Sequence, residues 1–261
     1  MIGAFYKEIH IPNPFSTCLA SVYHSLVRSF VPQFHGECDL VLLDVPTFEQ
    51  DKPLSVHVRT TIRYFYSYIE TAVLQIGDDK LEVTSFGEYA WNEIDGASLT
   101  EATLAGFPIY HSSPSPKRHV FDVVLGPNEN VTLSTFKDLV SVSVTGGTKE
   151  HFGDSVGMMG SFDGGRMLGR DGKTLMTPDD HDVFGQEWQV QADEPMLFRS
   201  VRHPQNPEQC RLPSKGDKDS AAKKRRRRLG ETGISRPVAE AACGHVPADR
   251  KEACIFDGKT L

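Results

Sequence analysis

Apolar and polar residues alternate over several short stretches of the chain, which is the pattern of a β-strand that buries one face. The alternation runs through residues 54–64 and places His57 and Arg59 on the polar face. It resumes over residues 72–76, passes a Gly-Asp-Asp sequence at 77–79 and leads into another short run. A Gly/Asp cluster between two alternating runs predicts a tight β-hairpin.

The same pattern returns further along the chain. Two alternating runs, residues 120–125 and 131–136, flank a Gly-Pro-Asn turn sequence, and a third run follows at residues 140–144. Long stretches with the 3.6-residue period of a helix are absent from the sequence before residue 200. Short strands separated by turn residues predict an all-β protein, built as an antiparallel β-sandwich or barrel.

Changes of composition divide the chain into four parts. Residues 1–33 form an irregular segment, and residues 34–192 carry the β pattern. Residues 193–233 become rich in Pro, Lys, Asp and Ser and are expected to be a disordered basic linker. Residues 234–261 contain an alanine-rich run behind Ser235, a helix-capping residue type, and are expected to form a short helical segment with two cysteines.

The charge is distributed unevenly along the chain. The net charge is −7, yet residues 211–228 hold nine basic and two acidic residues. Three interpretations of this run stay open: a solvated linker, a processing site of a secretory precursor at Arg225, Arg226, Arg227 and Arg228, or a nuclear-targeting patch. Because the chain is acidic as a whole and no aromatic residues interleave the run, we expect no nucleic-acid partner.

The overall composition, with 39% hydrophobic and 24% charged residues, is that of a globular protein. No run of about 18 apolar residues exists, so we expect no membrane insertion of this chain. The first 33 residues lack the uninterrupted apolar run of a secretion signal. Either the protein is cytosolic or this start is not the true start of the parent product.

The five cysteines are too few for a disulfide-rich scaffold, and their odd number leaves at least one without a partner in the chain. Cys243 and Cys254 lie on either side of a short turn sequence and predict a disulfide that closes a helical hairpin. Two unrelated buried thiols are the alternative. The pairing of Cys18, Cys38 and Cys210 stays open at this point.

Glycine and aspartate are concentrated in residues 146–185. A loop of this length and composition is typical either of a plain surface loop or of a segment held by a hard cation such as calcium. Within it, residues 153–157 read Gly-Asp-Ser-Val-Gly and match the G-x-S-x-G pattern of serine hydrolases. That pattern would make Ser155 a nucleophile, with His151 or His181 as its base, and it is the alternative function that we carry.

Residues 130–132 read Asn-Val-Thr, so Asn130 is a glycosylation acceptor if the chain enters the secretory pathway.

Four pieces of the sequence, in order, resemble the von Willebrand factor type D domain. Residues 34–42 resemble its early F-x-G-x-C-x-Y-x-L strand, and residues 54–59 resemble the strand that follows. Residues 155–164 resemble its G-L-C-G-N-[FY]-[DN]-G segment. Residues 184–190 resemble its closing F-G-x-x-W-x-V strand, which would place Trp188 on the last strand of the body. The resemblance covers residues 34–192.

The resemblance implies an extracellular β-sandwich module that is structural and adhesive rather than enzymatic. It further implies partners among extracellular proteins or matrix glycoproteins, and a calcium ion near Asp163, with Asp171 as a second carboxylate. The chain departs from the family because Met159 stands where the family has its second cysteine, so Cys38 lacks its usual partner. It is therefore expected to be a divergent and truncated member.

Overall fold

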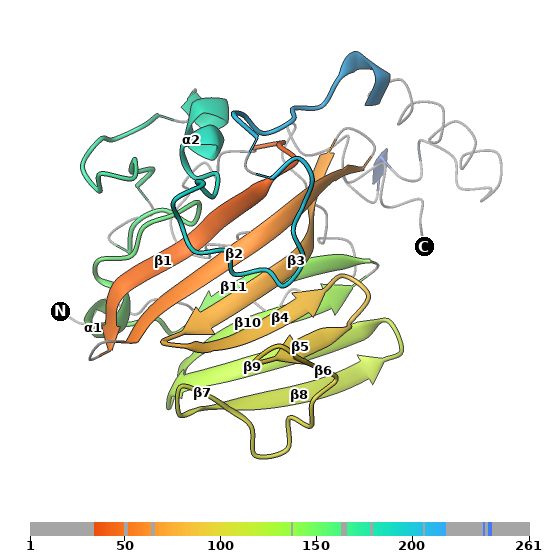
Figure 1. Cartoon of the computed structure of the whole chain (residues 1–261), viewed down its shortest axis with the longest axis vertical. Helices are drawn as coiled ribbons and strands as arrows, with labels where there is room; N and C mark the ends of the chain where they lie inside the picture. The colour runs from red at the N-terminus through yellow and green to blue at the C-terminus, as the bar shows by residue number, and fades with distance from the viewer. Residues whose placement is uncertain are drawn as a thin grey trace.

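The computed structural model describes residues 34–49, 52–63, 66–136, 138–162, 166–177, 180–205, 207–217, 237, 240 and 241 (Figure 1). Over these residues the chain is mostly β and forms two antiparallel sheets. The predicted β class and the antiparallel pairing are thereby confirmed.

The first sheet has the strand order β1-β2-β3-β4-β5-β6. Its strands are β1 (Asp39–Glu49), β2 (Lys52–Arg63), β3 (Tyr66–Ile76), β4 (Asp79–Thr84), β5 (Tyr89–Trp91) and β6 (Ile94–Asp95). The second sheet has the order β11-β10-β9-β8-β7. Its strands are β7 (Thr103–Leu104), β8 (Phe107–Ser115), β9 (Arg118–Gly126), β10 (Glu129–Phe136) and β11 (Leu139–Thr145).

The two sheets share one hydrophobic core. Leu54 and Val56 of β2 are fully buried in it, together with Phe121 of β9 and Leu133 of β10. These are the apolar positions of the alternating runs, so the sequence pattern identified the inward face of both sheets. The hairpin between β3 and β4 is also confirmed, because its turn residue Gly77 has a positive φ of 57°.

The outer face of the first sheet is covered by a segment that we call the strap, residues 194–211, of which residue 206 lies outside the described residues. In Figure 1 the strap is the cyan trace that crosses β1, β2 and β3. Leu197 and Phe198 of the strap pack on Val73 of β3. The guanidinium of Arg59 lies 4.4 Å from the centroid of the Phe198 ring.

The strap changes two expectations drawn from the sequence. His57 and Arg59 were placed on a polar, solvated face, but they are only 5% and 8% exposed because the strap covers them. Residues 193–217 were assigned to a disordered linker, but in the structure residues 194–205 and 207–211 cover the sheet. The remainder of the predicted linker, residues 218–233, lies outside the described residues.

Among the described residues, the helices α1 (Lys149–Phe152) and α2 (His181–Glu187) follow the second sheet. The predicted closing strand over residues 184–190 is wrong for its first half, because residues 184–187 belong to α2. Phe184 and Trp188 are both buried, and their i, i+4 spacing puts them on one side of a helix. Only after Trp188 does the chain extend along β1, where the Val190 amide donates to the Asp39 carbonyl at 2.9 Å.

A disulfide joins Cys38, just before β1, to Cys210 in the strap, with 5.2 Å between the two Cα atoms. Cys38 thus has a partner, although not the one that the family pattern would supply. Met159, which stands at that family position, is buried in the same core cluster as Cys38. Among the described residues, no helix is long and apolar enough to cross a membrane.

Candidate functional site

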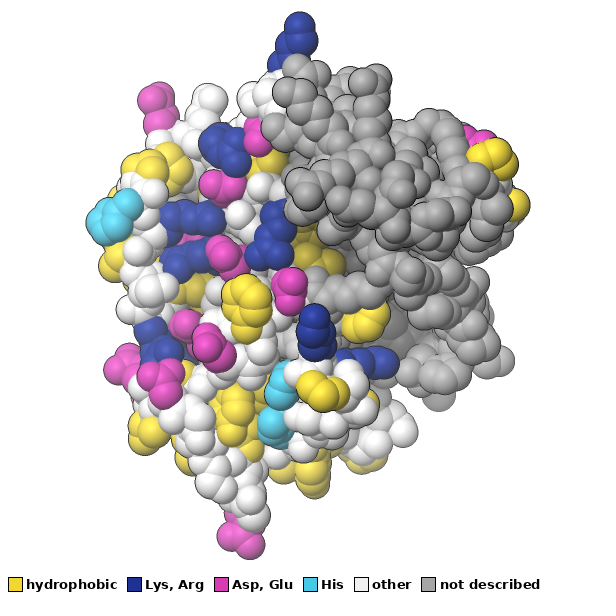
Figure 2. All heavy atoms as spheres, turned by 90° about the vertical axis from the view of Figure 1, so that its right-hand side faces the viewer, with side chains coloured by type: hydrophobic (Ala, Val, Ile, Leu, Met, Phe, Trp, Pro, Cys, Tyr) yellow, Lys and Arg dark blue, Asp and Glu magenta, His cyan; other side chains and the backbone are white. Residues whose placement is uncertain are grey.

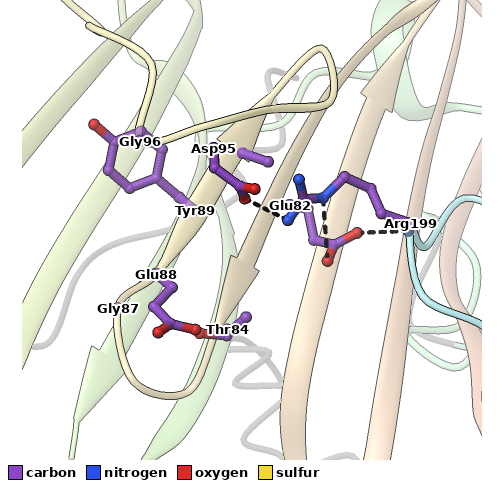
Figure 3. Close-up of a pocket in the computed structure, with 9 residues that line it drawn as sticks. Glu82, Thr84, Gly87, Glu88, Tyr89, Asp95, Gly96 and Arg199 are labelled. Atoms are coloured by element: carbon purple, nitrogen blue, oxygen red, sulfur yellow. Dashed lines mark hydrogen bonds and ion pairs between the residues drawn. The ribbon is translucent and has the colours of Figure 1, made fainter.

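A cavity of about 440 Å³ opens at the edge of the first sheet, between the β4–β6 strands and the strap. Figure 3 shows the side chains that surround it. Its polar groups are the carboxylates of Glu82, Glu88 and Asp95, the hydroxyl groups of Thr84 and Tyr89, and the guanidinium of Arg199. Three carboxylates against one guanidinium make the lining acidic.

Arg199 of the strap organises one wall of this cavity. Its backbone amide donates to Glu82 Oε2 at 2.9 Å, and its Nη2 donates to Asp95 Oδ1 at 2.5 Å. The hydrogen bond from Arg199 lowers the pKa of Asp95, and the same bond raises the pKa of Arg199. Glu82 is 8% exposed, so the strap supplies the cation that a buried carboxylate requires.

Two exposed apolar side chains directly precede lining residues of the cavity in the sequence. Phe86, 66% exposed, directly precedes the lining residue Gly87, and Ile94, 62% exposed, directly precedes the lining residue Asp95. The lining therefore offers an acidic hollow, which suits a basic side chain.

The Gly-Asp-Ser-Val-Gly sequence lies where α1 returns to the first sheet. Ser155 is 5% exposed, and its backbone amide donates to the Phe152 carbonyl at 3.0 Å. Val156 then forms a bridge with Asp44 of β1. A serine nucleophile of the G-x-S-x-G type needs a strand before it and a helix after it, and here the order is reversed.

His151, the first candidate base, is engaged elsewhere. Its Nδ1 lies 2.6 Å from Glu129 Oε2, and the other oxygen of Glu129 accepts from the Thr148 amide at 2.7 Å. His181, the second candidate, begins α2. Among the described residues, no hydrogen bond joins the Ser155 hydroxyl to the His151 imidazole.

The second glycine of that sequence has a structural explanation. Gly157 has a φ of 117°, and a Cβ atom at this position would lie 2.7 Å from the Leu42 carbonyl oxygen of β1. Glycine is required there because the chain runs against β1 with a backbone conformation that other residues rarely adopt. The packing against β1 therefore accounts for the second glycine of the G-x-S-x-G match.

Of the two carboxylates expected to bind calcium, Asp163 lies outside the described residues. Asp171 is described, and its Oδ2 accepts from the Thr174 hydroxyl at 2.7 Å while its Oδ1 accepts from the Lys173 and Thr174 amides. The hydrogen bond from Thr174 is the main reason why the pKa of Asp171 falls to about 2. Among the described residues, no group of three or more His, Cys, Asp or Glu side chains is arranged to hold a metal ion.

The remaining predicted sites divide between described and undescribed residues. Asn130 lies in β10 and is half-buried, with its Nδ2 3.2 Å from Thr132 Oγ1 and 3.4 Å from Asp122 Oδ1. Its glycosylation stays a prediction. The expected disulfide of Cys243 and Cys254 and the processing run Arg225–Arg228 lie outside the described residues.

Sequence reasoning missed the partnership of Glu82 with Arg199 and of Cys38 with Cys210. One signal for the strap was present, since Met196-Leu197-Phe198 is an apolar triplet inside a stretch that otherwise reads as polar. Such a triplet indicates burial rather than a solvated linker. A comparison with protein-family models and with curated proteins finds no match to this chain.

Proposed function

We propose that this chain is a non-enzymatic structural or adhesion module of the extracellular space, of the von Willebrand factor type D kind. Its partners on this proposal are other extracellular proteins or matrix glycoproteins. The observation that carries the proposal is the Cys38–Cys210 disulfide, which ties the strap to the edge of the first sheet.

Disulfides persist in oxidising compartments and are rare in the cytosol, where thiols are kept reduced. Both cysteines of this pair are buried, at 0% and 4% exposure, so the bond belongs to the interior of the module. A buried bond between distant parts of the chain is typical of a structural disulfide rather than of a catalytic one. This supports assignment to the secretory pathway.

The acidic cavity at Glu82 and Asp95 is the contact surface that we assign to a partner. Its carboxylates suit a lysine or arginine side chain of another extracellular protein. Figure 2 shows basic and acidic side chains interleaved over the described part of one face, rather than a patch of one sign. Such a surface fits recognition of a protein better than recognition of a polyanion.

The localisation can be tested on the full-length parent product, tagged and expressed in its own cell type. We expect it in the secretory compartments or the medium, with Cys38 and Cys210 joined when free thiols are alkylated before peptide mapping. Recovery from the cytosol with Cys38 alkylated would overturn the proposal.

The absence of hydrolase activity is tested separately. A fluorophosphonate probe should not label the folded chain, and it should give the same result with Ser155→Ala. Labelling of the parent chain that disappears in Ser155→Ala would establish the hydrolase alternative instead.

Calcium stabilisation, which the family resemblance implies, is part of the proposal. Calcium that binds only the folded chain raises the melting temperature by mass action, so about 5 mM calcium should raise it relative to a chelator. The shift should disappear in Asp163→Asn. In Asp182→Asn, a change at an exposed carboxylate at the start of α2, the shift should persist. Identical melting curves with calcium and with chelator would remove calcium from the proposal.

A further inference from the structure

The inward face of the β8–β9 hairpin ends in polar side chains. Ile109 of β8 pairs with Val123 of β9, and both are buried in the core. The next pair on the same face is His111 with Phe121. Alternation along the strands then brings His119 to this face as well. Two imidazoles thus occupy the row in which the core pattern would place apolar side chains.

Three donor atoms of this row face one another. His111 Nε2 lies 3.3 Å from His119 Nδ1, and Ser113 Oγ lies 3.0 Å from His119 Nδ1 and 3.4 Å from His111 Nε2. Metal–imidazole bonds of about 2.0–2.1 Å in tetrahedral geometry require donor atoms roughly 3.3 Å apart. The triangle of donors therefore has the dimensions of one face of a metal coordination sphere.

The two rings are held in place by their surroundings. The His111 ring stacks on Phe121, with 4.4 Å between centroids and 4° between planes. Tyr89 of the first sheet contacts both of these rings. His119 is packed against Gly87 so closely that a Cβ atom there would lie 2.2 Å from its Cδ2. A preorganised pair of ligands loses little freedom when it binds an ion.

The contact between the two ring nitrogens also suits a metal. In the absence of an ion, His111 Nε2 and His119 Nδ1 contact each other through at most one shared proton. Neutral imidazole is the form that binds metals, so an ion can replace the shared proton.

We propose that His111 and His119 bind a zinc ion or a similar late divalent transition metal, with the Ser113 hydroxyl beside them. Imidazole nitrogen favours zinc, copper and nickel over calcium and magnesium, so this site differs in chemistry from the expected calcium loop. His111 and Ser113 are exposed and His119 is half-buried, which leaves coordination positions open to water or to a side chain of a partner.

The test is a zinc titration of the oxidised full chain by calorimetry, with all free thiols alkylated so that cysteines outside the described residues take no part. We expect one zinc ion per chain, and at least tenfold weaker binding in His111→Gln and in His119→Gln. The matched control is His203→Gln, which changes an exposed histidine of the strap and should bind zinc like the parent chain. Calcium at the same concentration should not compete.

Cobalt gives a second readout. When nitrogen atoms ligate cobalt, visible absorption bands appear, and these bands report the ligands of the ion rather than the fold of the chain. Circular dichroism establishes that each variant is folded before titration. Zinc affinity unchanged in both histidine variants, or no zinc binding by the parent chain at millimolar concentration, would overturn the proposal.

Discussion

His57 is a titratable side chain enclosed between the first sheet and the strap. It is 5% exposed, and its Nδ1 has no hydrogen-bond partner among the described residues. Burial lowers its pKa to about 4, against the opposing influence of Glu194 and Asp39 and with smaller contributions from Arg170 and Lys80. Because this buried imidazole is neutral, the packing of the strap on the first sheet is sensitive to acid.

The sign of that sensitivity follows from the pKa values. Since the folded-state pKa lies below the ordinary value of 6.5, the unfolded chain binds the proton first as the pH falls. The stability is fully present above pH 6.5 and declines towards pH 4, by about 3 kcal/mol for this group at 1.36 kcal/mol per pKa unit. We expect His57→Gln to reduce the loss of unfolding free energy between pH 7 and pH 4, measured by urea denaturation.

His203→Gln serves as the control for this pH series, because His203 is exposed and lies in the same strap. It should leave the pH dependence as it is in the parent chain. Parallel curves for the parent and His57→Gln would contradict the role of His57.

Gly157 provides a second prediction at the residue scale. Its φ of 117° and the 2.7 Å approach of a Cβ atom to the Leu42 carbonyl oxygen predict that Gly157→Ala costs about 2–3 kcal/mol of unfolding free energy. Gly172→Ala is the matched comparison, since Gly172 also has a positive φ but nothing within 4 Å of its Cβ position. It should cost about 1 kcal/mol. Equal losses in chemical denaturation would show that the contact with β1 contributes nothing.

At the scale of elements, α2 attaches the end of the β domain to β1. Trp188 follows the helix and is 3% exposed, its Nε1 donates to the Leu168 carbonyl at 3.0 Å, and the guanidinium of Arg170 lies 5.2 Å from its ring centroid. The Trp188 carbonyl accepts from the Val41 amide of β1. One residue, through its side chain and its backbone carbonyl, therefore joins the helix, the preceding loop and the sheet.

Truncation of this side chain should lower stability strongly. We expect Trp188→Ala to cost about 3–5 kcal/mol, because a large buried ring is replaced by a cavity. Trp188→Phe keeps a ring but loses the hydrogen bond to Leu168, and should cost about 1–3 kcal/mol. Thermal unfolding followed by circular dichroism measures both. An unchanged melting temperature in Trp188→Ala would mean that α2 does not anchor the domain.

The elements that the sequence predicted well are those whose pattern is local. Alternation over residues 120–125 and 131–136 identified β9 and β10, because each run reports on its own inward face. The stretch at 184–190 was expected to be a strand because of the family resemblance, whereas the i, i+4 spacing of the buried Phe184 and Trp188 fits a helix. The Glu82–Arg199 contact spans 117 positions, and no local pattern reports such a pairing.

At the scale of the whole molecule, the Cys38–Cys210 disulfide closes a loop with a sequence separation of 172. Cross-linking restricts the unfolded chain more strongly as the loop becomes longer. We expect the double variant Cys38→Ser/Cys210→Ser to lose about 2–5 kcal/mol of unfolding free energy in chemical denaturation. Cys243→Ser/Cys254→Ser is the comparison, because the predicted loop between those cysteines is short. A larger loss in the comparison variant would contradict this expectation.

The same bond decides how the molecule responds to being pulled. A force applied outside residues 38 and 210 passes from one sulfur atom to the other and bypasses both sheets. Chain between the cysteines cannot lengthen until the bond is reduced, and reduction then releases on the order of 600 Å of contour length, at roughly 3.5 Å per residue over the separation of 172. Under tension, the module behaves as a short, inextensible link. The contour length between the two cysteines becomes available only when a reductant breaks the bond.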